Sequence, residues 1–494
     1  MIVKTLQDEI QNYLVDASNF RGNCEAVYIP ENANEVSQLL LSASDSKTNV
    51  TIAGNHTGLT GSGVPQNGIV ISTEKMNRIL EIHTEEKYAI VEPGVLLQDL
   101  QAELKQLGSF YPPDPTETNC FLGGTIATNA SGAKTFKYGP TRNYVLELEI
   151  ILADGDKLFL KRGEVFVVKN VLRLQTQNGN KLSLQLPDYK FPKVKNASGY
   201  FVDENMDAID LFIGSEGTLG VITKAKLKIL PIPYDVLSCV TFFSDEKDGL
   251  AFIEEARTLS YASRRINSAG NLDARALEYF DSNTLNFLRE DFRQIDGNAA
   301  CAVWFEQVLT AQNEESITEA WLELITKHNA DVDKVWIGVD DKDKALLHEF
   351  RHAVSYKVNE YLSKNNLRKL GTDVAVPDEA FVEFYSFCKA LVEKEKLDLV
   401  AYGHFGNSHL HLNMLPKNEE EFLKGKAIYK MICQEAVDLE GTVSAEHGIG
   451  KIKREYLLMM YGEQAIEEMI KLKRELDPNM ILGMGNLFEI PMIK

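Results

Sequence analysis

Hydrophobic and polar positions in the first 230 residues follow two patterns, one helical and one strand-like. Apolar residues recur three and four positions apart over residues 34–44, which predicts a helix with one buried face. Residues 95–107 carry a second amphipathic helical pattern. Short apolar runs bounded by turn residues predict strands at 49–53, 68–72, 88–92 and 145–152, and a further strand-rich block at 211–230. Asp154-Gly155, directly after the fourth run, is a hairpin signal.

The pattern changes after Pro231-Ile232-Pro233, which we take as the first domain boundary. Long charged helical patterns follow at 245–258, 313–329, 341–363 and 378–395, with strand-like runs at 299–306 and 399–404. This mixture predicts an α+β unit with helices on one face of a sheet. Residues 419–476 are largely helical up to Pro478, and we expect the C-terminal tail to return to the first domain. The expected domains are 1–232, 233–425 and 426–494.

Composition and charge narrow the class of protein. The chain has 494 residues, 44% hydrophobic and 25% charged, which is typical of globular proteins. Its net charge of -20 argues against nucleic acid and anionic membranes as main partners, although a few local cations can still hold a small anionic substrate. Six scattered cysteines without a CxxC pair favour a reducing compartment. The sequence shows no signal peptide and no transmembrane segment, so we expect a cytoplasmic protein.

Histidines cluster strongly near the end of the second domain. Only nine occur in the chain, yet His404, His409 and His411 fall within eight positions, and Glu446-His447 follows. Imidazoles and a carboxylate on Gly-interrupted backbone suit a divalent metal with an open coordination position. His409 and His411 would face the same way on a strand, whereas His404 joins them only if the chain bends at 406–408. The alternative interpretation, that these histidines lie on a strand and form ordinary hydrogen bonds, stays open.

Three Gly-rich segments lie in the first domain, at 53–63, 111–132 and 213–223. Their small and hydroxyl residues present backbone N–H groups to an anion such as a pyrophosphate. The first segment is not a Rossmann fingerprint, because Pro65 spoils the turn into a helix, and it lacks the Gly-Lys-Ser/Thr of a Walker A loop. A plain surface loop would explain one such segment, whereas three favour a long nucleotide cofactor.

With these motifs the sequence resembles the FAD-binding domain of vanillyl-alcohol-oxidase-type flavoproteins, also called the PCMH type. The histidine segment makes it similar to the branch of D-lactate, glycolate and D-2-hydroxyglutarate dehydrogenases. The resemblance runs from about residue 20 to 488. It implies an α+β protein: two α+β subdomains that hold FAD, an α+β cap domain with an antiparallel sheet, and a C-terminal helical segment that returns to the FAD domain.

The resemblance also implies which residues hold FAD. Those around the pyrophosphate are Gly54, Asn55, His56, Thr57 and Gly58. Those lining the flavin are Pro113, Asp114, Thr118, Gly123, Gly124, Asn129 and Gly132. Those at the adenine and ribose end are Glu216, Gly220 and Ile222. A C-terminal flavin contact is implied at Asn486, where residues 483–486 replace the usual Asn-Pro-Gly-Lys. His56 stands where some superfamily members bind flavin covalently, but its neighbours look like the non-covalent loop, so we expect non-covalent FAD.

A divalent metal (Zn, Mn or Fe) is implied at His404, His411 and Glu446. His409 and Asn407 replace the Asn and Asp of the family motif Gly-Asp-Gly-Asn-x-His, which leaves open whether His409 is a ligand. The resemblance assigns substrate contacts to four residues: Arg351 for the carboxylate, Ser355 one helical turn later, Asn413, and His447 as the general base.

The implied reaction is FAD-dependent oxidation of a small anionic D-2-hydroxy acid to the 2-oxo acid. Gly371 stands where D-2-hydroxyglutarate enzymes tend to carry a Lys, with Lys369 further back, which favours a D-lactate-like substrate over D-2-hydroxyglutarate or glycolate. The electron acceptor would be a quinone or an electron-transfer protein. A homodimer and a peripheral membrane location stay open. Two other classes remain: a flavin-independent metallohydrolase and a non-catalytic FAD- or metabolite-binding protein.

Overall fold

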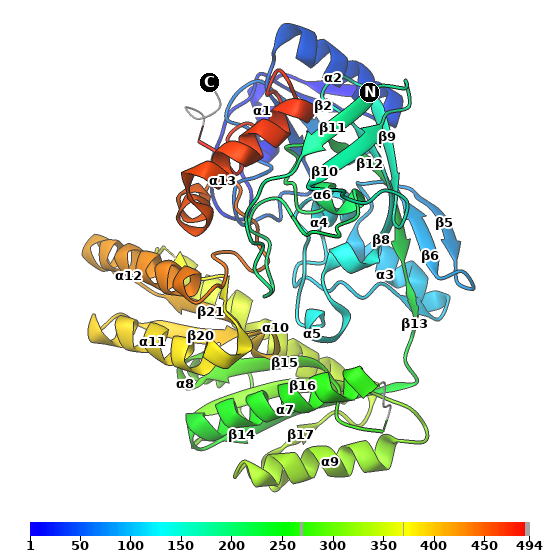
Figure 1. Cartoon of the computed structure of the whole chain (residues 1–494). Helices are drawn as coiled ribbons and strands as arrows, with labels where there is room; N and C mark the ends of the chain where they lie inside the picture. Colours follow the sequence, from blue (N-terminus) through cyan, green and yellow to red (C-terminus); the bar gives the residue numbers. More distant parts are fainter. Residues whose placement is uncertain (267–269, 369, 490–494) are drawn as a thin grey trace.

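The computed structural model describes residues 1–266, 270–368 and 370–489, which form two α+β bodies (Figure 1). The upper body contains the N-terminal strands and the last long helix, and the lower body contains the segment from β14 (Asp235–Phe243) to α12 (Glu419–Asp438). The chain passes between them after β13 (Leu230–Pro231). No helix in these ranges is long and apolar enough to cross a membrane.

A four-stranded sheet begins the upper body, in the order β1-β2-β4-β3. Its strands are β1 (Ile2–Lys4), β2 (Ala26–Ile29), β3 (Val50–Ala53) and β4 (Ile69–Ser72). β2, β4 and β3 run parallel because α2 (Ala33–Ser46) crosses over between β2 and β3. The Asn32 side chain caps α2 by accepting the Glu35 N–H. The helix and both strands predicted here are confirmed.

A five-stranded antiparallel sheet completes the upper body, in the order β5-β6-β12-β8-β9. Its strands are β5 (Ile79–His83), β6 (Tyr88–Val91), β8 (Val145–Ile151), β9 (Lys157–Lys161) and β12 (Val221–Lys228). The predicted hairpin turns at Gly155, whose φ of 80° favours glycine. Further elements are α3 (Leu97–Gln106), β7 (Ser109–Phe110), α4 (Leu122–Ala127), β10 (Val171–Gln175), β11 (Lys181–Gln185) and α6 (Ile209–Phe212).

The lower body is built on one large antiparallel sheet, in the order β17-β14-β16-β15-β20-β21-β18, with β19 also on β21. Its further strands are β15 (Ala274–Asp281), β16 (Cys301–Leu309), β17 (Trp336–Ile337), β18 (Leu370–Gly371), β19 (Val374–Ala375), β20 (Leu399–Gly403) and β21 (His409–Met414). Its helices before α12 are α7 (Glu246–Ile266), α8 (Ser282–Leu288), α9 (Glu314–Lys327), α10 (Asp341–Lys364) and α11 (Phe381–Lys394).

Helices cover both faces of this sheet, so the prediction of helices on one face was wrong. Along β15, Leu277 and Tyr279 pack in the apolar cluster that includes α7, α9 and α11. Ala276 and Phe280 point the other way, into the cluster that includes α8 and α10. Side chains alternate between faces along a strand, so a central strand buried on both faces has a continuous apolar run. β16, with eight of its nine residues buried, shows that pattern.

The C-terminal part returns to the upper body, as expected. The long loop 439–453 separates α12 from α13 (Arg454–Leu476). Ile481 and Leu482 then pack beside Val36 and Val50, and the Val50 N–H donates to the Ile481 carbonyl at 2.8 Å. The expected boundary between residues 425 and 426 falls inside α12, which is one continuous helix.

Candidate active site

The histidine cluster lies where β20 turns back into β21. Gly403 ends β20 with a φ of 148°, and a Cβ there would come within 2.8 Å of the His409 carbonyl oxygen. A short turn at Phe405–Asn407 follows, and Ser408 adopts a left-handed conformation before His409. The predicted bend is present, and it brings the His404 and His411 rings to 5.5 Å between centroids.

Glu446 meets these histidines from the loop 439–453. Its Oε1 lies 3.2 Å from His411 Nε2, and its Oε2 lies 3.4 Å from His404 Nε2. The Lys195 ammonium donates to Oε2 at 2.6 Å. His404, His409, His411 and Glu446 can each offer a ligand atom within 4.8 Å of the others.

The outer nitrogens of two imidazoles are held by acceptors. His404 Nδ1 donates to Glu278 Oε1 at 2.7 Å, and His411 Nδ1 donates to the Thr372 carbonyl at 3.2 Å. Each ring therefore directs its Nε2 toward Glu446, the arrangement usual for metal-binding histidines. His409 differs, because Nε2 donates to Asp373 Oδ1 at 3.0 Å while Nδ1 accepts from Lys195 at 3.2 Å. The donor set of His404, His411 and Glu446 fits a divalent cation.

The charges in this cluster act in opposite directions on a bound cation, since Glu446 favours it and a protonated His404 opposes it. Burial would raise the pKa of Glu446, but Lys195 and His404 hold it well below its ordinary value, so the carboxylate stays ionised. Burial lowers the pKa of His411, which keeps its imidazole neutral with a free lone pair. At His404, the charge of Glu278 outweighs burial and raises the pKa, which favours positive charge on that ring.

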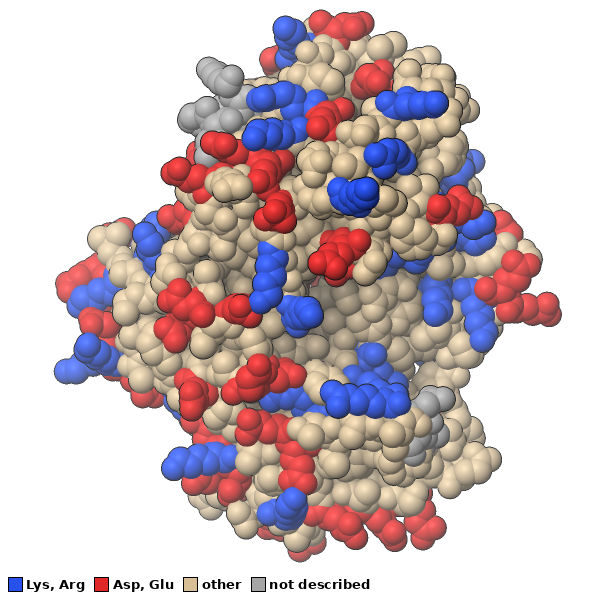
Figure 2. Space-filling model, in the orientation of Figure 1, with Lys and Arg blue, Asp and Glu red and all other residues tan. Residues whose placement is uncertain are grey.

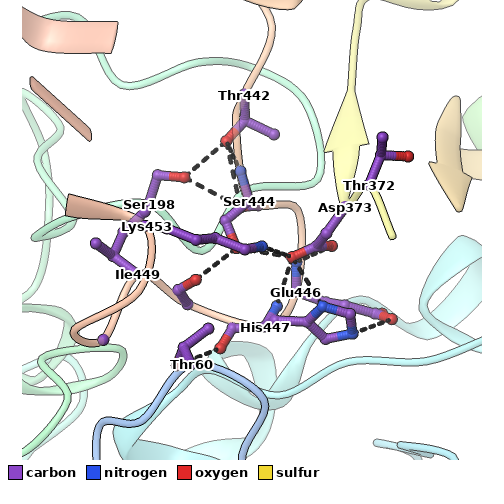
Figure 3. Close-up of polar contacts among 12 residues, drawn as sticks. Thr60, Ser198, Thr372, Asp373, Thr442, Ser444, Glu446, His447, Ile449 and Lys453 are labelled. Atoms are coloured by element: carbon purple, nitrogen blue, oxygen red, sulfur yellow. Dashed lines mark hydrogen bonds and ion pairs between the residues drawn. The ribbon is translucent and has the colours of Figure 1, made fainter. Parts of the chain in front are cut away.

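Asp373 links the cluster to His447 (Figure 3). Its Oδ2 lies 3.2 Å from His447 Nδ1 and accepts the Lys453 ammonium at 2.8 Å and the Ser444 hydroxyl at 2.7 Å. Burial would raise the pKa of Asp373, but these charges and the donation from His409 hold it well below its ordinary value. The His447 side chain keeps 26% of its surface exposed, and its Nε2 lies 3.6 Å from Glu446 Oε1.

Arg351 approaches from α10 and is buried. Its Nε and Nη2 donate to Glu278 Oε2 at 3.2 and 3.1 Å, and its Nη1 donates to Thr116 of the upper body at 3.0 Å. Two of its five N–H groups donate to no described residue, so they remain for a ligand. Ser355 follows one turn later on the same helix, half-buried.

Asn413 lies on β21 opposite Gly371, and its buried Nδ2 has no hydrogen-bond partner among the described residues. An orphaned donor of this kind fits contact with a ligand. Lys369 lies outside the described residues.

The three Gly-rich segments converge on the loop 439–453. Thr60 Oγ1 donates to the His447 carbonyl at 3.4 Å, and Ser131 Oγ donates to Glu446 Oε2 at 3.3 Å. The Glu216 carboxylate accepts the N–H groups of Ile449 and Gly450 at 2.8 and 2.7 Å. A ligand held along these segments therefore lies beside the histidine cluster.

The same segments form a cradle with open glycine faces. Among the atoms of residues 1–266, 270–368 and 370–489, a Cβ on Gly124 would meet none within 4 Å, and one on Gly54 would only touch Gly124 and Phe121 at 4.0 Å. Gly132 is required for another reason, since a Cβ there would lie 1.8 Å from the Asp114 carbonyl. The adjoining Asn55, Thr57, Gly58, Pro113, Thr118, Gly123 and Asn129 belong to the same segments. The residues present fit a long flat cofactor.

Other predicted cofactor residues have structural partners. Asn486 Nδ2 donates to the Ser62 and Glu216 carbonyls, which ties the C-terminal segment to two of the Gly-rich loops. Ile222 packs in the core on β12, and a Cβ on Gly220 would meet Ile150 at 2.5 Å. The His56 ring lies edge-on to Tyr13, and both its nitrogens are buried without a hydrogen-bond partner in the described part of the chain. Their contacts with FAD stay predictions.

Sequence reasoning missed Lys195, Glu278 and the role of Asp373. Glu278 had a detectable signal, since it interrupts an apolar strand between Leu277 and Tyr279. Lys195 had none, because it lies in a polar loop far from the histidine segment.

Comparisons with known proteins show which family the chain belongs to. A model of the FAD binding domain matches residues 24–160, and a model of the C-terminal domain of FAD linked oxidases matches residues 246–487. The D-lactate dehydrogenase of Archaeoglobus fulgidus is 31% identical over 93% of this chain and 90% of its own. The glycolate oxidase subunit GlcD of Bacillus subtilis is 29% identical over 96% and 92%, and a D-2-hydroxyglutarate dehydrogenase of Stutzerimonas stutzeri is 27% identical over 98% and 96%.

A solved alkyldihydroxyacetonephosphate synthase has the same fold, with a TM-score of 0.65 at 14% identity over 97% of this chain and 81% of its own. The chain belongs to the family of FAD-linked oxidases with the PCMH-type fold, and it is an FAD-linked oxidoreductase. The flavin-independent metallohydrolase is therefore excluded as a class.

Proposed function

We propose that this protein oxidises a D-2-hydroxy acid to the 2-oxo acid, and that a D-lactate-like monocarboxylate is the preferred substrate. One observation carries the proposal: the carboxylate of Glu278 joins Arg351, a carboxylate-binding group, to His404 of the candidate metal cluster. A 2-hydroxy acid has a carboxylate and a hydroxyl on adjacent carbons, so it needs such paired groups close together. A non-catalytic FAD-binding protein would need neither.

Arg351 would bind the carboxylate of the substrate. Its guanidinium is fixed by Glu278 and Thr116 before any ligand binds, which lowers the entropy cost of binding. Its two remaining N–H groups suit a planar carboxylate. Asn413, with an orphaned donor, and Ser355, on the same helix as Arg351, would complete the substrate contacts.

His447 would take the proton of the substrate hydroxyl. Asp373 Oδ2 lies 3.2 Å from Nδ1, which favours a proton on that nitrogen and leaves Nε2, 3.6 Å from Glu446 Oε1, as the base. The ionised Asp373 then stabilises the imidazolium that forms. A divalent cation (Zn, Mn or Fe) held by His404, His411 and Glu446 would supply Lewis acidity at the hydroxyl. We assign His409 to the support of Asp373, because both of its ring nitrogens already have partners.

FAD supplies the two-electron acceptor for this oxidation when it is bound. We propose that it is held without a covalent bond, which the position of His56 supports: its nitrogens are buried against Tyr13. The loops on which the described contacts converge would place the cofactor beside the substrate.

The preference for a monocarboxylate is supported by Gly371, which has no side chain with which to bind a second carboxylate. D-2-hydroxyglutarate and glycolate are the alternatives, as the names of the relatives indicate.

We further propose a quinone or an electron-transfer protein as the final acceptor, a cytoplasmic location that could include the membrane surface, and a homodimer. Figure 2 shows acidic and basic side chains interspersed over one face, with a recess between its two halves through which a small anion could enter.

A substrate panel tests the proposal. Purified FAD-loaded protein would be assayed with an artificial electron acceptor on D- and L-lactate, glycolate, and D- and L-2-hydroxyglutarate, with detection of the 2-oxo acid. We expect the highest kcat/KM with D-lactate. A preference for an L-enantiomer, or no turnover of any member by folded FAD-loaded enzyme, would contradict it.

A further inference from the structure

Glu278 is a buried carboxylate in the middle of the large sheet, 4% exposed. Ala276 and Phe280, two positions away on β15, pack in the cluster with Phe350 of α10. Because side chains alternate along a strand, Glu278 projects from this same α10-facing side. An ionised side chain in such surroundings is unfavourable unless both of its oxygens are satisfied.

Each oxygen of Glu278 has a different partner. Oε1 accepts from His404 Nδ1 at 2.7 Å, and Oε2 accepts from Arg351 Nε and Nη2 at 3.2 and 3.1 Å. His404 is close because Gly403, the residue before it, pairs with Tyr279 across β20 and β15. Burial would raise the pKa of Glu278, but His404 and Arg351 lower it to about 2.

The partners of Glu278 present their other atoms to the site. His404 Nε2 lies 3.4 Å from Glu446 Oε2 in the candidate metal cluster. Arg351 Nη1 reaches Thr116 of the upper body. A carboxylate in a purely structural ion pair needs only one cationic side chain as its partner. Glu278 instead orients two groups, which would act on opposite ends of one small substrate.

We propose that Glu278 is a positioning residue that aligns the metal end and the carboxylate end of the substrate site. Through Oε1 it fixes the ring of His404, and through Oε2 it fixes the guanidinium of Arg351. The distance between the hydroxyl and carboxylate subsites is therefore set by one rigid carboxylate. This inference rests on the proposed function, which it deepens by naming the residue that sets the spacing.

Glu278→Gln tests it, because the amide keeps the size of the side chain but can accept hydrogen bonds at only one of its two terminal atoms. The FAD-loaded protein, stripped of metal, would be titrated with Mn²⁺ against a chromophoric chelator, and KM for D-lactate would be measured separately. We expect the Mn²⁺ Kd to rise about 10- to 100-fold, as for other outer partners of metal ligands. We expect KM to rise about tenfold or more.

Glu306→Gln is the matched control. Glu306 is a buried carboxylate on the neighbouring strand β16, and it accepts from Arg275 Nε at 2.6 Å, away from the histidines. Both constants should stay within about threefold of wild type. FAD content and thermal unfolding would report folding, and Glu278→Asp replaces the test variant if Glu278→Gln does not fold, since it keeps the charge but shortens the reach.

The outcomes separate this inference from the function on which it rests. Mn²⁺ affinity and KM both within threefold of wild type in a folded Glu278 variant would overturn it. A change at one end alone would also overturn it, because Glu278 would then serve a single partner. Wild-type protein that binds no Mn²⁺ would remove the metal from the proposed function and overturn the part of this inference that concerns His404. The substrate panel on wild-type protein tests the proposed function separately, because it does not depend on the Glu278 variants.

Discussion

The imidazole of His447 and the carboxylate of Asp373 lie 3.2 Å apart, from Nδ1 to Oδ2. The backbone N–H of His447 donates to the same oxygen at 3.0 Å, so Asp373 fixes both the main chain and the ring. Lys453 and Ser444 hold this carboxylate in turn (Figure 3). With Nδ1 facing Asp373, Nε2 is the ring atom that would accept a proton, and it lies 3.6 Å from Glu446 Oε1.

Asp373→Asn should lower kcat by about 10²- to 10⁴-fold, because the amide no longer fixes the tautomer or stabilises the imidazolium. Steady-state kinetics with D-lactate would measure the loss. Asp378→Asn is the control, since Asp378 lies nearby on the chain but pairs with Arg257. Equal kcat in wild type and Asp373→Asn would show that the proton is taken elsewhere.

Arg351→Lys should lower transition-state stabilisation, derived from the kcat/KM for D-lactate, by about 2–5 kcal/mol. The loss should come mainly from a higher KM, because an ammonium cannot reproduce the planar donor pair of the guanidinium. Arg275→Lys provides the comparison: Arg275 forms a similar buried pair with Glu306. If both variants lose the same activity, the effect comes from the sheet and not from carboxylate binding.

Chelation should slow turnover, and adding back a divalent cation should restore it. His411→Asn should weaken metal binding more than the roughly 10- to 100-fold typical of an outer partner, whereas His409→Asn should stay within about tenfold of wild type. Metal content and Mn²⁺ titration would distinguish them. A larger loss of Mn²⁺ affinity in His409→Asn than in His411→Asn would show that His409 is a metal ligand.

Much of the architecture could be predicted because it depends on local pattern. The hairpin at Asp154-Gly155 and the bend between His404 and His409 follow from turn chemistry, and both are present. The prediction of helices on one face of the large sheet is wrong because its strands, such as β16, are continuously apolar and buried on both faces.

The candidate site was only partly predictable. The histidines could be predicted as site residues because they are rare and closely spaced in the sequence. Glu278 and Lys195 could not, because they are common residue types in distant segments. Nothing local in the sequence shows that Lys195 meets Glu446, 251 positions away. Such contacts depend on how the two bodies pack.

FAD should be released by acid precipitation, because we propose that His56 forms no bond to flavin. The supernatant should be yellow, and the intact mass of the protein should match the sequence. A yellow pellet, with protein heavier by one flavin, would contradict the non-covalent assignment.

Stability should depend on pH through Asp281, which caps α8 by accepting the Thr284 N–H. Burial raises its pKa to about 6, and its Oδ2 has no partner among the described residues. The folded state thus binds this proton more tightly than the unfolded state does, so its stabilising effect is complete below about pH 4 and is lost as the pH rises through about 6.

Asp281→Asn keeps a good helix cap without the buried charge. The variant should be about 1–3 kcal/mol more stable than wild type at pH 7, and the difference should disappear near pH 4. Urea unfolding at both values would measure this. A variant less stable than wild type at pH 7 would show that the charged cap is favourable.

The central claim is that FAD, the histidine cluster and Arg351 act together on a D-2-hydroxy acid. Anaerobic mixing of the FAD-loaded protein with D-lactate, followed at the flavin absorbance in a single turnover, tests it most directly. We predict rapid bleaching with D-lactate, far slower bleaching with L-lactate, and pyruvate equal to the flavin reduced. Flavin that stays oxidised with D-lactate and every other D-2-hydroxy acid, in protein that retains FAD and metal, would contradict the account.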